Sequence, residues 1–231
     1  MTGALRITGW TLIVAGVVVL LYVVYSLLFT GVTTESAQAS MRDAWQAEVG
    51  ALDAPSEAPT PEATELAGEE PAGEEPASEE AAAPVTPPPQ GEAVAVLQFV
   101  RPGAEPPVHA EPLFVVEGTS RDELARGPGH YVGTALPGED GNMAIAGHRT
   151  TYAAPFFHLD QLQEGDEVHV TGRDGRRHVY RFLERRIVAP TETWVLEPDP
   201  LGRGRPLLTL TTCHPRFSAA QRMIVFAELV E

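Results

Sequence analysis

The sequence predicts an all-β domain, folded as a sandwich or a barrel, behind a single N-terminal helix that can span a membrane. The residues Ile7–Phe29 form one uncharged, strongly apolar run. Residues 51–90 consist mostly of Ala, Pro and Glu, a composition typical of a linker. Residues 91–231 contain several short apolar runs punctuated by Gly, Pro and Asp. Many short strands separated by turn residues are typical of sandwiches and barrels.

The first predicted element is a membrane-spanning helix. Ile7–Phe29 holds 23 residues without a charged side chain, which is long enough to cross a hydrocarbon core. Ala37-Gln38-Ala39 resembles a signal-peptide cleavage site, but the apolar run is longer than the core of a typical signal peptide. We therefore expect an uncleaved anchor. Arg6 precedes the span and Arg42 follows it among acidic residues, so we expect the N-terminus in the cytoplasm.

Residues 1–50 would thus hold a cytoplasmic tip, the span and a juxtamembrane segment, and residues 51–90 a disordered linker. The linker carries ten acidic residues and no basic one. Proline and charge repulsion favour an extended chain, which would reach roughly 35 Å as a flexible coil and up to about 120 Å when stretched. We expect this reach to let the C-terminal domain work away from the membrane surface.

The formal net charge of −16 comes mostly from the first part of the chain. Residues 1–90 hold 13 acids and 2 arginines, and residues 91–231 hold 19 acids and 14 arginines. Neither part has the basic character of a nucleic-acid-binding protein. All basic residues are arginine, so no lysine can act as a base or form a Schiff base.

The 141 residues from Gly91 to Glu231 are enough for one domain with a hydrophobic core. Seven runs within it are predicted strands: Ala93–Val100, Leu113–Val116, Asn142–Ala146, Glu167–Thr171, His178–Val188, Leu207–Cys213 and Met223–Val230. Two short helices are expected, one over Arg121–Arg126 capped by Ser120 and one over Pro155–Gln161.

Cys213, the only cysteine, ends the strand Leu207–Cys213. It can form no intramolecular disulfide, so a secreted domain would keep it reduced despite the risk of oxidation. A buried hydrophobic residue is the ordinary interpretation of a lone cysteine, and a reactive nucleophile is the alternative. Alternation places Cys213 on the strand face with Thr209 and Thr211, opposite Leu208 and Leu210. The thiol should therefore point to a polar rim or groove.

Arg222 is predicted to lie close to Cys213. The segment His214–Gln221 between the last two strands is short enough to connect antiparallel neighbours. Cys213 and Arg222 would then flank the same loop, with Arg222 pointing away from the apolar set that begins at Met223. A surface arginine paired with a carboxylate is the competing interpretation.

Three segments in this order resemble the signature of the sortase family: Ala146-Gly147-His148-Arg149, Thr209-Leu210-Thr211-Thr212-Cys213 and Arg222. The longer stretches Gly127–Tyr131, Gly138–Thr151 and Met223–Leu229 resemble the class E sortases of actinobacteria, and the similarity covers residues 91–231. The resemblance implies a closed eight-stranded β-barrel and a cysteine transpeptidase. Such an enzyme cuts a sorting motif between Thr and Gly and joins the threonine to an amine.

The resemblance also implies the site residues. Cys213 would attack the scissile carbonyl as a thiolate. His148 would protonate the departing amine and later deprotonate the incoming one. Arg222 would stabilise the oxyanion or hold the sorting peptide. These three residues are the expected catalytic set.

Three further residues are expected to line the substrate site. Tyr131 is the candidate for selecting Ala at the second position of the motif, with a core tyrosine as the alternative. His130 beside it is also expected to line the site. Thr212 can offer a donor to the oxyanion, although threonine is also a common strand former. His214 is adjacent to Cys213 but points to the opposite strand face, so no direct catalytic role is expected.

No metal or cofactor is expected, because the sequence has no paired cysteines and no acidic calcium loop. Pro102–Glu111 is the one segment that could cover the cleft as a lid, although proline-rich loops are often plain connections.

The sequence therefore predicts a membrane-anchored transpeptidase with an extracellular catalytic domain. Its expected partners are secreted proteins bearing a C-terminal Leu-Ala-x-Thr-Gly or Leu-Pro-x-Thr-Gly signal and, as acceptor, the amine of a peptidoglycan precursor of the lipid II type. A pilin polymerase would differ only in the attacking amine. A wall- or pilin-binding barrel without catalysis is the alternative from another class, and an inert, buried Cys213 would favour it.

Overall fold

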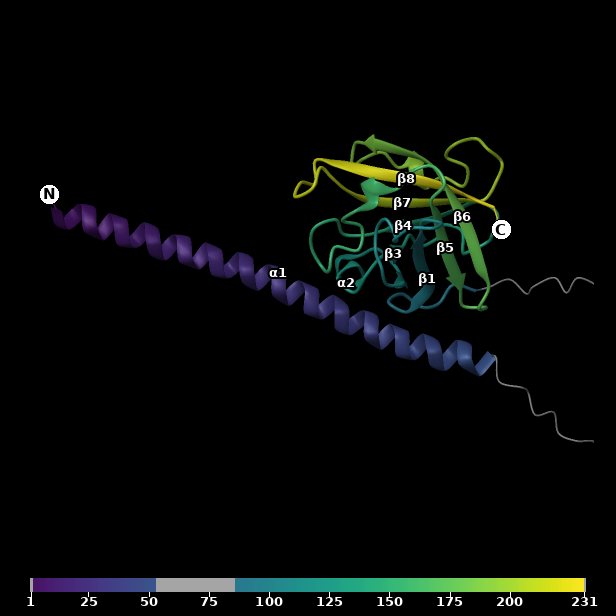
Figure 1. The fold of residues 1–231 in the computed structure, drawn as a ribbon, viewed down its shortest axis with the longest axis horizontal. Coiled ribbons are helices and arrows are strands. Elements are labelled where there is room, and N and C mark those ends of the chain that lie inside the picture. Colours follow the sequence, from purple (N-terminus) through teal and green to yellow (C-terminus); the bar gives the residue numbers. More distant parts are fainter. Residues whose placement is uncertain (1, 53–85, 231) are drawn as a thin grey trace, which may run out of the picture.

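A computed structural model describes residues 2–52 and 86–230. Figure 1 shows a long helix, α1, lying alongside a β-barrel. The predicted linker, residues 51–90, falls mostly outside the described residues. The elements are α1 Thr2–Leu52, β1 Ala93–Val100, β2 Leu113–Glu117, α2 Arg121–Leu124, β3 Gly129–His130, β4 Asn142–Ala146, η1 Leu159–Gln161, β5 Glu167–Gly172, β6 Arg177–Val188, η2 Trp194–Leu196, β7 Leu207–His214 and β8 Gln221–Leu229.

The strands close into a barrel in the order β1-β2-β3-β4-β7-β8-β6-β5. This confirms the expected eight-stranded closed barrel, and each of the seven predicted runs forms a strand. The eighth strand, β3, has only two residues, too few to produce a sequence pattern. It joins the sheet by pairing parallel to β2 and antiparallel to β4.

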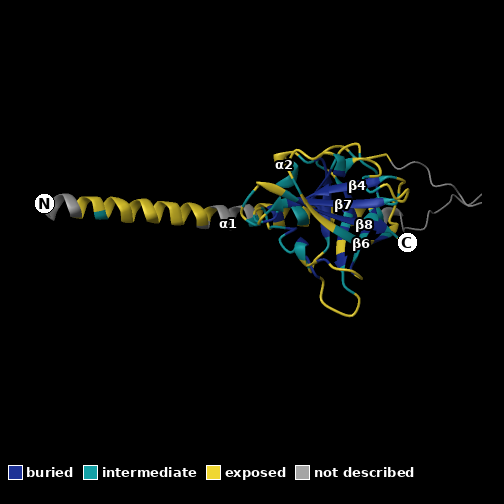
Figure 2. Cartoon of the chain, turned by 90° about the horizontal axis from the view of Figure 1, so that it is seen from above, coloured by how far each residue is buried: buried dark blue, intermediate teal, exposed yellow. Residues whose placement is uncertain are grey.

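Alternating residues of the strands fill the barrel. Leu97, Phe99, Leu208, Leu210 and Val225 belong to one buried cluster inside it. Figure 2 shows this buried interior against the exposed N-terminal half of α1. Burial of such side chains stabilises the domain by roughly 1.5–3 kcal/mol each.

The two predicted helices are shorter than expected. α2 covers only Arg121–Leu124, and Ser120 stands at its N-cap without a side-chain capping hydrogen bond. Pro155–Gln161 forms turns and a single 3₁₀ turn at Leu159–Gln161. The ring of Phe156 instead enters the core, so this segment is shaped by burial of an aromatic residue.

α1 is a single helix that continues well beyond the predicted span. The window from Arg6 to Val23 is apolar, is not buried in the monomer and is long enough to cross a membrane. The later residues Met41 and Trp45 are buried against Phe114 and Val116 on the outside of the barrel. The segment predicted to be juxtamembrane therefore packs against the barrel.

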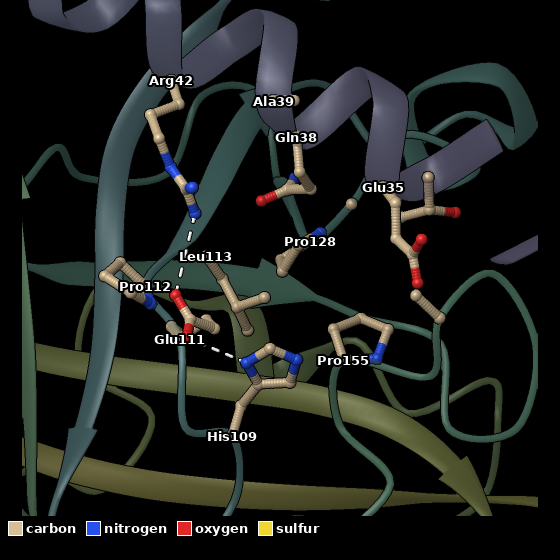
Figure 3. A pocket seen from close by; sticks show the side chains of 13 residues that line it. Glu35, Gln38, Ala39, Arg42, His109, Glu111, Pro112, Leu113, Pro128 and Pro155 are labelled. Atoms are coloured by element: carbon tan, nitrogen blue, oxygen red, sulfur yellow. Dashed lines mark hydrogen bonds and ion pairs between the residues drawn. The ribbon is translucent and has the colours of Figure 1, made fainter. Parts of the chain in front are cut away.

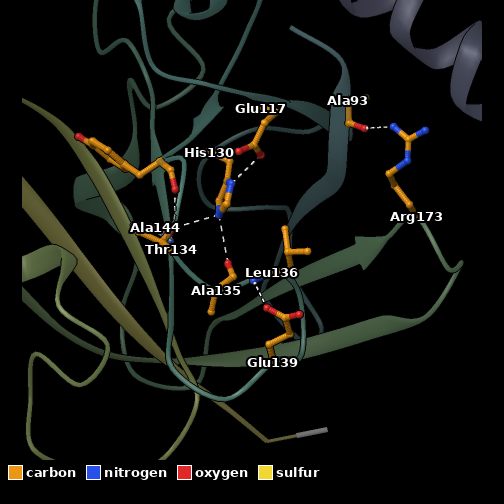
Figure 4. Close-up of polar contacts among 10 residues, drawn as sticks. Ala93, Glu117, His130, Thr134, Ala135, Leu136, Glu139, Ala144 and Arg173 are labelled. Carbon is orange, nitrogen blue, oxygen red and sulfur yellow. Dashed lines mark hydrogen bonds and ion pairs between the residues drawn. The ribbon is translucent and has the colours of Figure 1, made fainter. Parts of the chain in front are cut away.

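His130 on β3 is an internal residue of the barrel wall. Its ring is 1% exposed, with Nδ1 2.7 Å from Oε2 of Glu117 and Nε2 2.9 Å from the hydroxyl of Thr134. The same hydroxyl accepts a hydrogen bond from the backbone of Ala144 on β4 (Figure 4). These side-chain bonds connect β2, β3 and β4 in addition to the two backbone pairs that β3 makes with each neighbour.

Candidate active site

Cys213 and Arg222 form a cross-strand pair. β7 and β8 are antiparallel, with Cys213 opposite Arg222 and His214 opposite Gln221 just before the connecting loop. Both Cys213 and Arg222 are half-buried. Leu208 and Leu210 point into the core, so Cys213 lies on the other face of β7, as the alternation predicts.

His148 reaches the same end of the barrel by a different route. β4 runs parallel to β7, with Ala146 opposite Thr211, so the chain leaves β4 beside Cys213. His148 and Cys213 line one open pocket of about 350 Å³. Its lining residues are His148, Arg149, Thr150, Thr151, Cys213, Phe217, Ser218 and Ala219.

Gly147 and Thr212 hold the His148 turn against β7. The buried hydroxyl of Thr212 donates a 2.7 Å hydrogen bond to the carbonyl of Gly147, whose N–H donates to the carbonyl of Thr211 at 3.0 Å. A Cβ at position 147 would lie 2.5 Å from the ring of Phe156. Glycine is thus required by close packing under His148. The Thr212 side chain therefore stabilises the turn by its hydrogen bond to Gly147 and does not line the pocket.

The ring of His148 is partly enclosed. Tyr152 packs over it, with the ring centroids 4.8 Å apart and the planes inclined by 30°. Burial lowers the pKa of His148 below the ordinary value near 6.5. Nε2 is buried and, among the described residues, has no hydrogen-bond partner. Within that part of the chain, this nitrogen is therefore both unpaired and shielded from solvent.

Arg149, which had no role assigned from the sequence, also lines this pocket. Its side chain is 3% exposed and donates to the carbonyl of Cys213 at 3.3 Å. The same guanidinium lies 3.1 Å from Nδ1 of His214 and 3.2 Å from Asp160. Its position directly after His148 was the available signal.

Asp160 compensates the buried charge of Arg149. Its carboxylate also accepts hydrogen bonds from Arg216 at 2.8 and 3.0 Å. Burial alone would raise the pKa of Asp160, but the charges of Arg149 and Arg216 outweigh it and the pKa lies below the usual range. The ionised carboxylate thus fixes Arg149 behind the pocket.

Arg222 lies at the rim of the pocket. Its Nη1 donates to the carbonyls of Ala219 and Gln221 at 3.0 Å each. Ala219 also lines the pocket. The competing interpretation paired Arg222 with a carboxylate. Within the described part of the chain, however, no carboxylate forms an ion pair with this guanidinium.

The remaining expected residues divide into two groups. The hydroxyl of Tyr131 lies 3.1 Å from that of Thr211, which shares the β7 face of Cys213, so Tyr131 stands beside the site. His130 is enclosed in the barrel wall and does not line the pocket. The candidate lid, Pro102–Glu111, does not line this pocket: His109 and Glu111 border a separate pocket beside α1.

The arrangement brings together a thiol, a partly buried imidazole and an arginine at the end of one barrel. Among the residues that the structure describes, no three His, Cys, Asp or Glu side chains are close enough to hold a metal ion. A thiol and an imidazole in one pocket suit acyl transfer through a thioester, and an arginine at the rim suits binding of an oxyanion or a peptide carbonyl.

Comparisons with a family model, with curated proteins and with solved structures all point to the same family. The family model described as "Sortase domain" matches residues 106–230. Sortase SrtE1 of Streptomyces coelicolor is 38% identical over 130 residues, which cover 51% of this chain and 36% of the relative. Sortase D of Bacillus subtilis is 32% identical over 147 residues, 62% of this chain and 67% of the relative. The structure of sortase E from Streptomyces avermitilis matches with a TM-score of 0.53 at 36% identity, covering 62% of this chain and 90% of that one.

Proposed function

This chain belongs to the sortase family, with class E sortases among its relatives, and we propose that it is a membrane-anchored cysteine transpeptidase. The observation that carries the proposal is the shared pocket of Cys213 and His148 with Arg222 directly opposite Cys213. The aligned region covers 36% of SrtE1, so the activity proposed here rests on the site of this chain.

The first half-reaction would cleave the sorting signal. The thiolate of Cys213 attacks the carbonyl carbon of the motif threonine, and the oxyanion formed is stabilised by Arg222. The C–N bond to glycine then breaks, the imidazolium of His148 gives its proton to the departing amine, and a thioester remains on Cys213.

The second half-reaction would release the product. An incoming amine attacks the thioester, His148 takes the proton that the amine loses, and the C–S bond breaks to regenerate the thiolate. The amine of a peptidoglycan precursor of the lipid II type is the proposed acceptor. The substrates are secreted proteins with a C-terminal Leu-Ala-x-Thr-Gly or Leu-Pro-x-Thr-Gly signal, and Tyr131 beside the Cys213 face is the proposed contact for the second motif position.

The apolar part of α1 would anchor the enzyme in the cell membrane. The Arg6 side faces the cytoplasm in this proposal, and the barrel lies outside the cell. The helix continues through Ala37–Ala39 and packs on the barrel beyond them, which supports an anchor that is not cleaved.

The test uses the full chain in lipid nanodiscs and quenched fluorescent Leu-Ala-x-Thr-Gly and Leu-Pro-x-Thr-Gly peptides. We expect cleavage that requires Cys213, a thioester adduct on Cys213 in mass spectrometry, and a transfer product when an amine is added. Cys213→Ala is the control. A folded protein that forms no adduct with either peptide would be a binding module instead.

A further inference from the structure

The second half of α1 packs on the barrel along one helical face. Thr34, Met41 and Trp45 are 2%, 4% and 8% exposed, although they belong to a helix outside the barrel. With Gln38 and Val49 they recur every three or four residues, the spacing of one helix face. Trp45 packs edge-on against Phe114 of β2, with ring centroids 6.1 Å apart.

Gln38 takes the place of a neighbouring strand at the edge of β2. β2 pairs with β3 only at Val116 and Glu117, so this side of Phe114 has no strand beside it. The Gln38 Oε1 accepts from the N–H of Phe114 at 2.8 Å, and Nε2 donates to the carbonyls of Phe114 and Arg126 at 2.9 and 3.0 Å. Unpaired buried backbone groups cost about 1–3 kcal/mol each, so docking of α1 is built into the fold.

The direction of docking is defined at both ends. The early residues of this segment line a pocket of about 380 Å³ together with loops from the Cys213 end of the barrel (Figure 3). These loops contribute His109 and Glu111 on one side and Ala153 and Pro155, which follow His148, on the other. At the opposite end of the barrel, Glu48 forms an ion pair with Arg173 beside the β5–β6 turn.

The apolar span and the docked segment belong to one continuous helix. From Phe29 to Thr34 the helix rises only about 7.5 Å. We propose that α1 is a rigid strut that holds the barrel against the bilayer, with the Cys213 pocket turned toward the membrane surface. This inference rests on the membrane anchoring proposed above.

The acidic segment then cannot act as a spacer. Residues 53–85 lie outside the described part of the chain, but both flanks lie at the barrel end that faces away from the membrane. Glu48 pairs with Arg173, and Pro88 lines a small pocket with Gly172 and Arg173. While α1 is docked, the length of this segment does not change the height of the barrel above the bilayer, contrary to the reach expected from its composition.

The lipid surface is therefore the partner of the Cys213 end, and the enzyme accepts sorting motifs that lie close to the bilayer. Phe217 supports this orientation. It lies in the β7–β8 loop at the edge of the pocket and is 82% exposed, unusual for a large apolar side chain. An aromatic ring at the bilayer interface gains from partial burial among the lipids.

The test measures the distance of each barrel end from the bilayer. The full chain is reconstituted into phosphatidylcholine and phosphatidylglycerol vesicles with a rhodamine-labelled headgroup lipid. An impermeant maleimide donor is attached to Cys213, the only thiol. The comparison chain carries Cys213→Ala and Arg176→Cys, which places the donor in the β5–β6 turn.

We expect energy transfer from Cys213 to exceed transfer from position 176 at least about twofold, because an eight-residue strand such as β7 separates the two ends by about 26 Å. Gln38→Ala with Met41→Ala should undock α1 and reduce the transfer from Cys213 to that of position 176, whereas Asp43→Ala on the exposed face should not change it. Circular dichroism melting confirms that each variant is folded.

Equal transfer from the two positions, or stronger transfer from position 176, would overturn the inference. The measurement does not require catalysis. If the chain cleaves no peptide but energy transfer from Cys213 is stronger, the proposed function is wrong and the strut is supported. If the chain cleaves the peptides but the two positions give equal transfer, the proposed function is supported and the strut is wrong.

Discussion

Cys213 on β7 lies directly opposite Arg222 on β8, one pair before the loop that joins the two strands. The cross-strand position brings Arg222 beside Cys213 through the register of the two strands. The carbonyls of Ala219 in the loop and of Gln221 at the start of β8 hold the guanidinium at the rim of the pocket. The pair therefore places a fixed positive charge beside the proposed nucleophile.

Arg222→Ala should lower kcat/KM for the sorting peptides by about 10²-fold, the usual effect of removing one donor to an oxyanion. Arg222→Lys should recover only part of the activity, since it keeps the charge and loses the planar fork of donors. Steady-state cleavage of the quenched peptides measures this, with the neighbouring Gln221→Ala as control. An Arg222→Ala enzyme with unchanged kcat/KM would remove Arg222 from the site.

Arg149→Met should lower both the stability of the fold and the turnover of the enzyme. The substitution leaves Asp160 with one arginine fewer and frees the carbonyl of Cys213, so we expect a loss of about 2–4 kcal/mol in the free energy of unfolding. The value of kcat should fall while KM changes little, because Arg149 positions Cys213 from behind. Denaturant unfolding and peptide kinetics measure the two effects.

Arg216→Met is the matched control, since Arg216 binds the same carboxylate from a more exposed position. Arg216→Met should lower the free energy of unfolding by less than about 1 kcal/mol. Equal effects of the two substitutions would show that Arg149 has no special part in holding Cys213.

His148 should titrate below about pH 6.5 in the folded protein, because burial disfavours the imidazolium. The unfolded chain then binds more protons than the folded one between the two pKa values. This contribution to stability is therefore present above pH 6.5 and is lost as the pH falls toward the pKa of folded His148. An NMR titration of the ring protons, assigned with His148→Gln, measures the midpoint.

Tyr152→Ala should uncover the His148 ring and move its pKa upward toward the ordinary value. Thr150→Ala, on the same loop, should leave the midpoint in place. A midpoint at or above 6.5 in the unsubstituted protein would contradict the assigned effect of burial.

Gly147→Ala should destabilise the fold by about 1–3 kcal/mol, because the new methyl group collides with the ring of Phe156. Phe156→Leu should make room for the methyl group. Gly147→Ala should therefore lower the free energy of unfolding by less in a chain that already carries Phe156→Leu. A double-mutant cycle of thermal unfolding gives the coupling energy. If the effects of the two substitutions on the free energy of unfolding were strictly additive, the contact with Phe156 would not be the reason that position 147 requires glycine.

Much of the fold could be predicted from the alternating apolar residues of the strands. In Leu207–Cys213 and Asn142–Ala146, alternation assigns which side chains share a face without any knowledge of the neighbouring strands, although nearly all residues of both strands are buried. The same alternation placed Cys213 on the face away from the core, and the short His214–Gln221 connection placed Arg222 beside it. These are local properties of the chain.

Only the tertiary structure decided the docking of α1, the strand β3 and the contacts of Arg149. Gln38 matters because the edge of β2 lacks a partner at Phe114, which no local pattern reveals. β3 is too short for periodicity, and Arg149 gains its contacts from Asp160 and Cys213, residues distant in sequence. The sequence determined which residues face the core, whereas the closed barrel determined which polar groups meet, because long-range packing sets those distances.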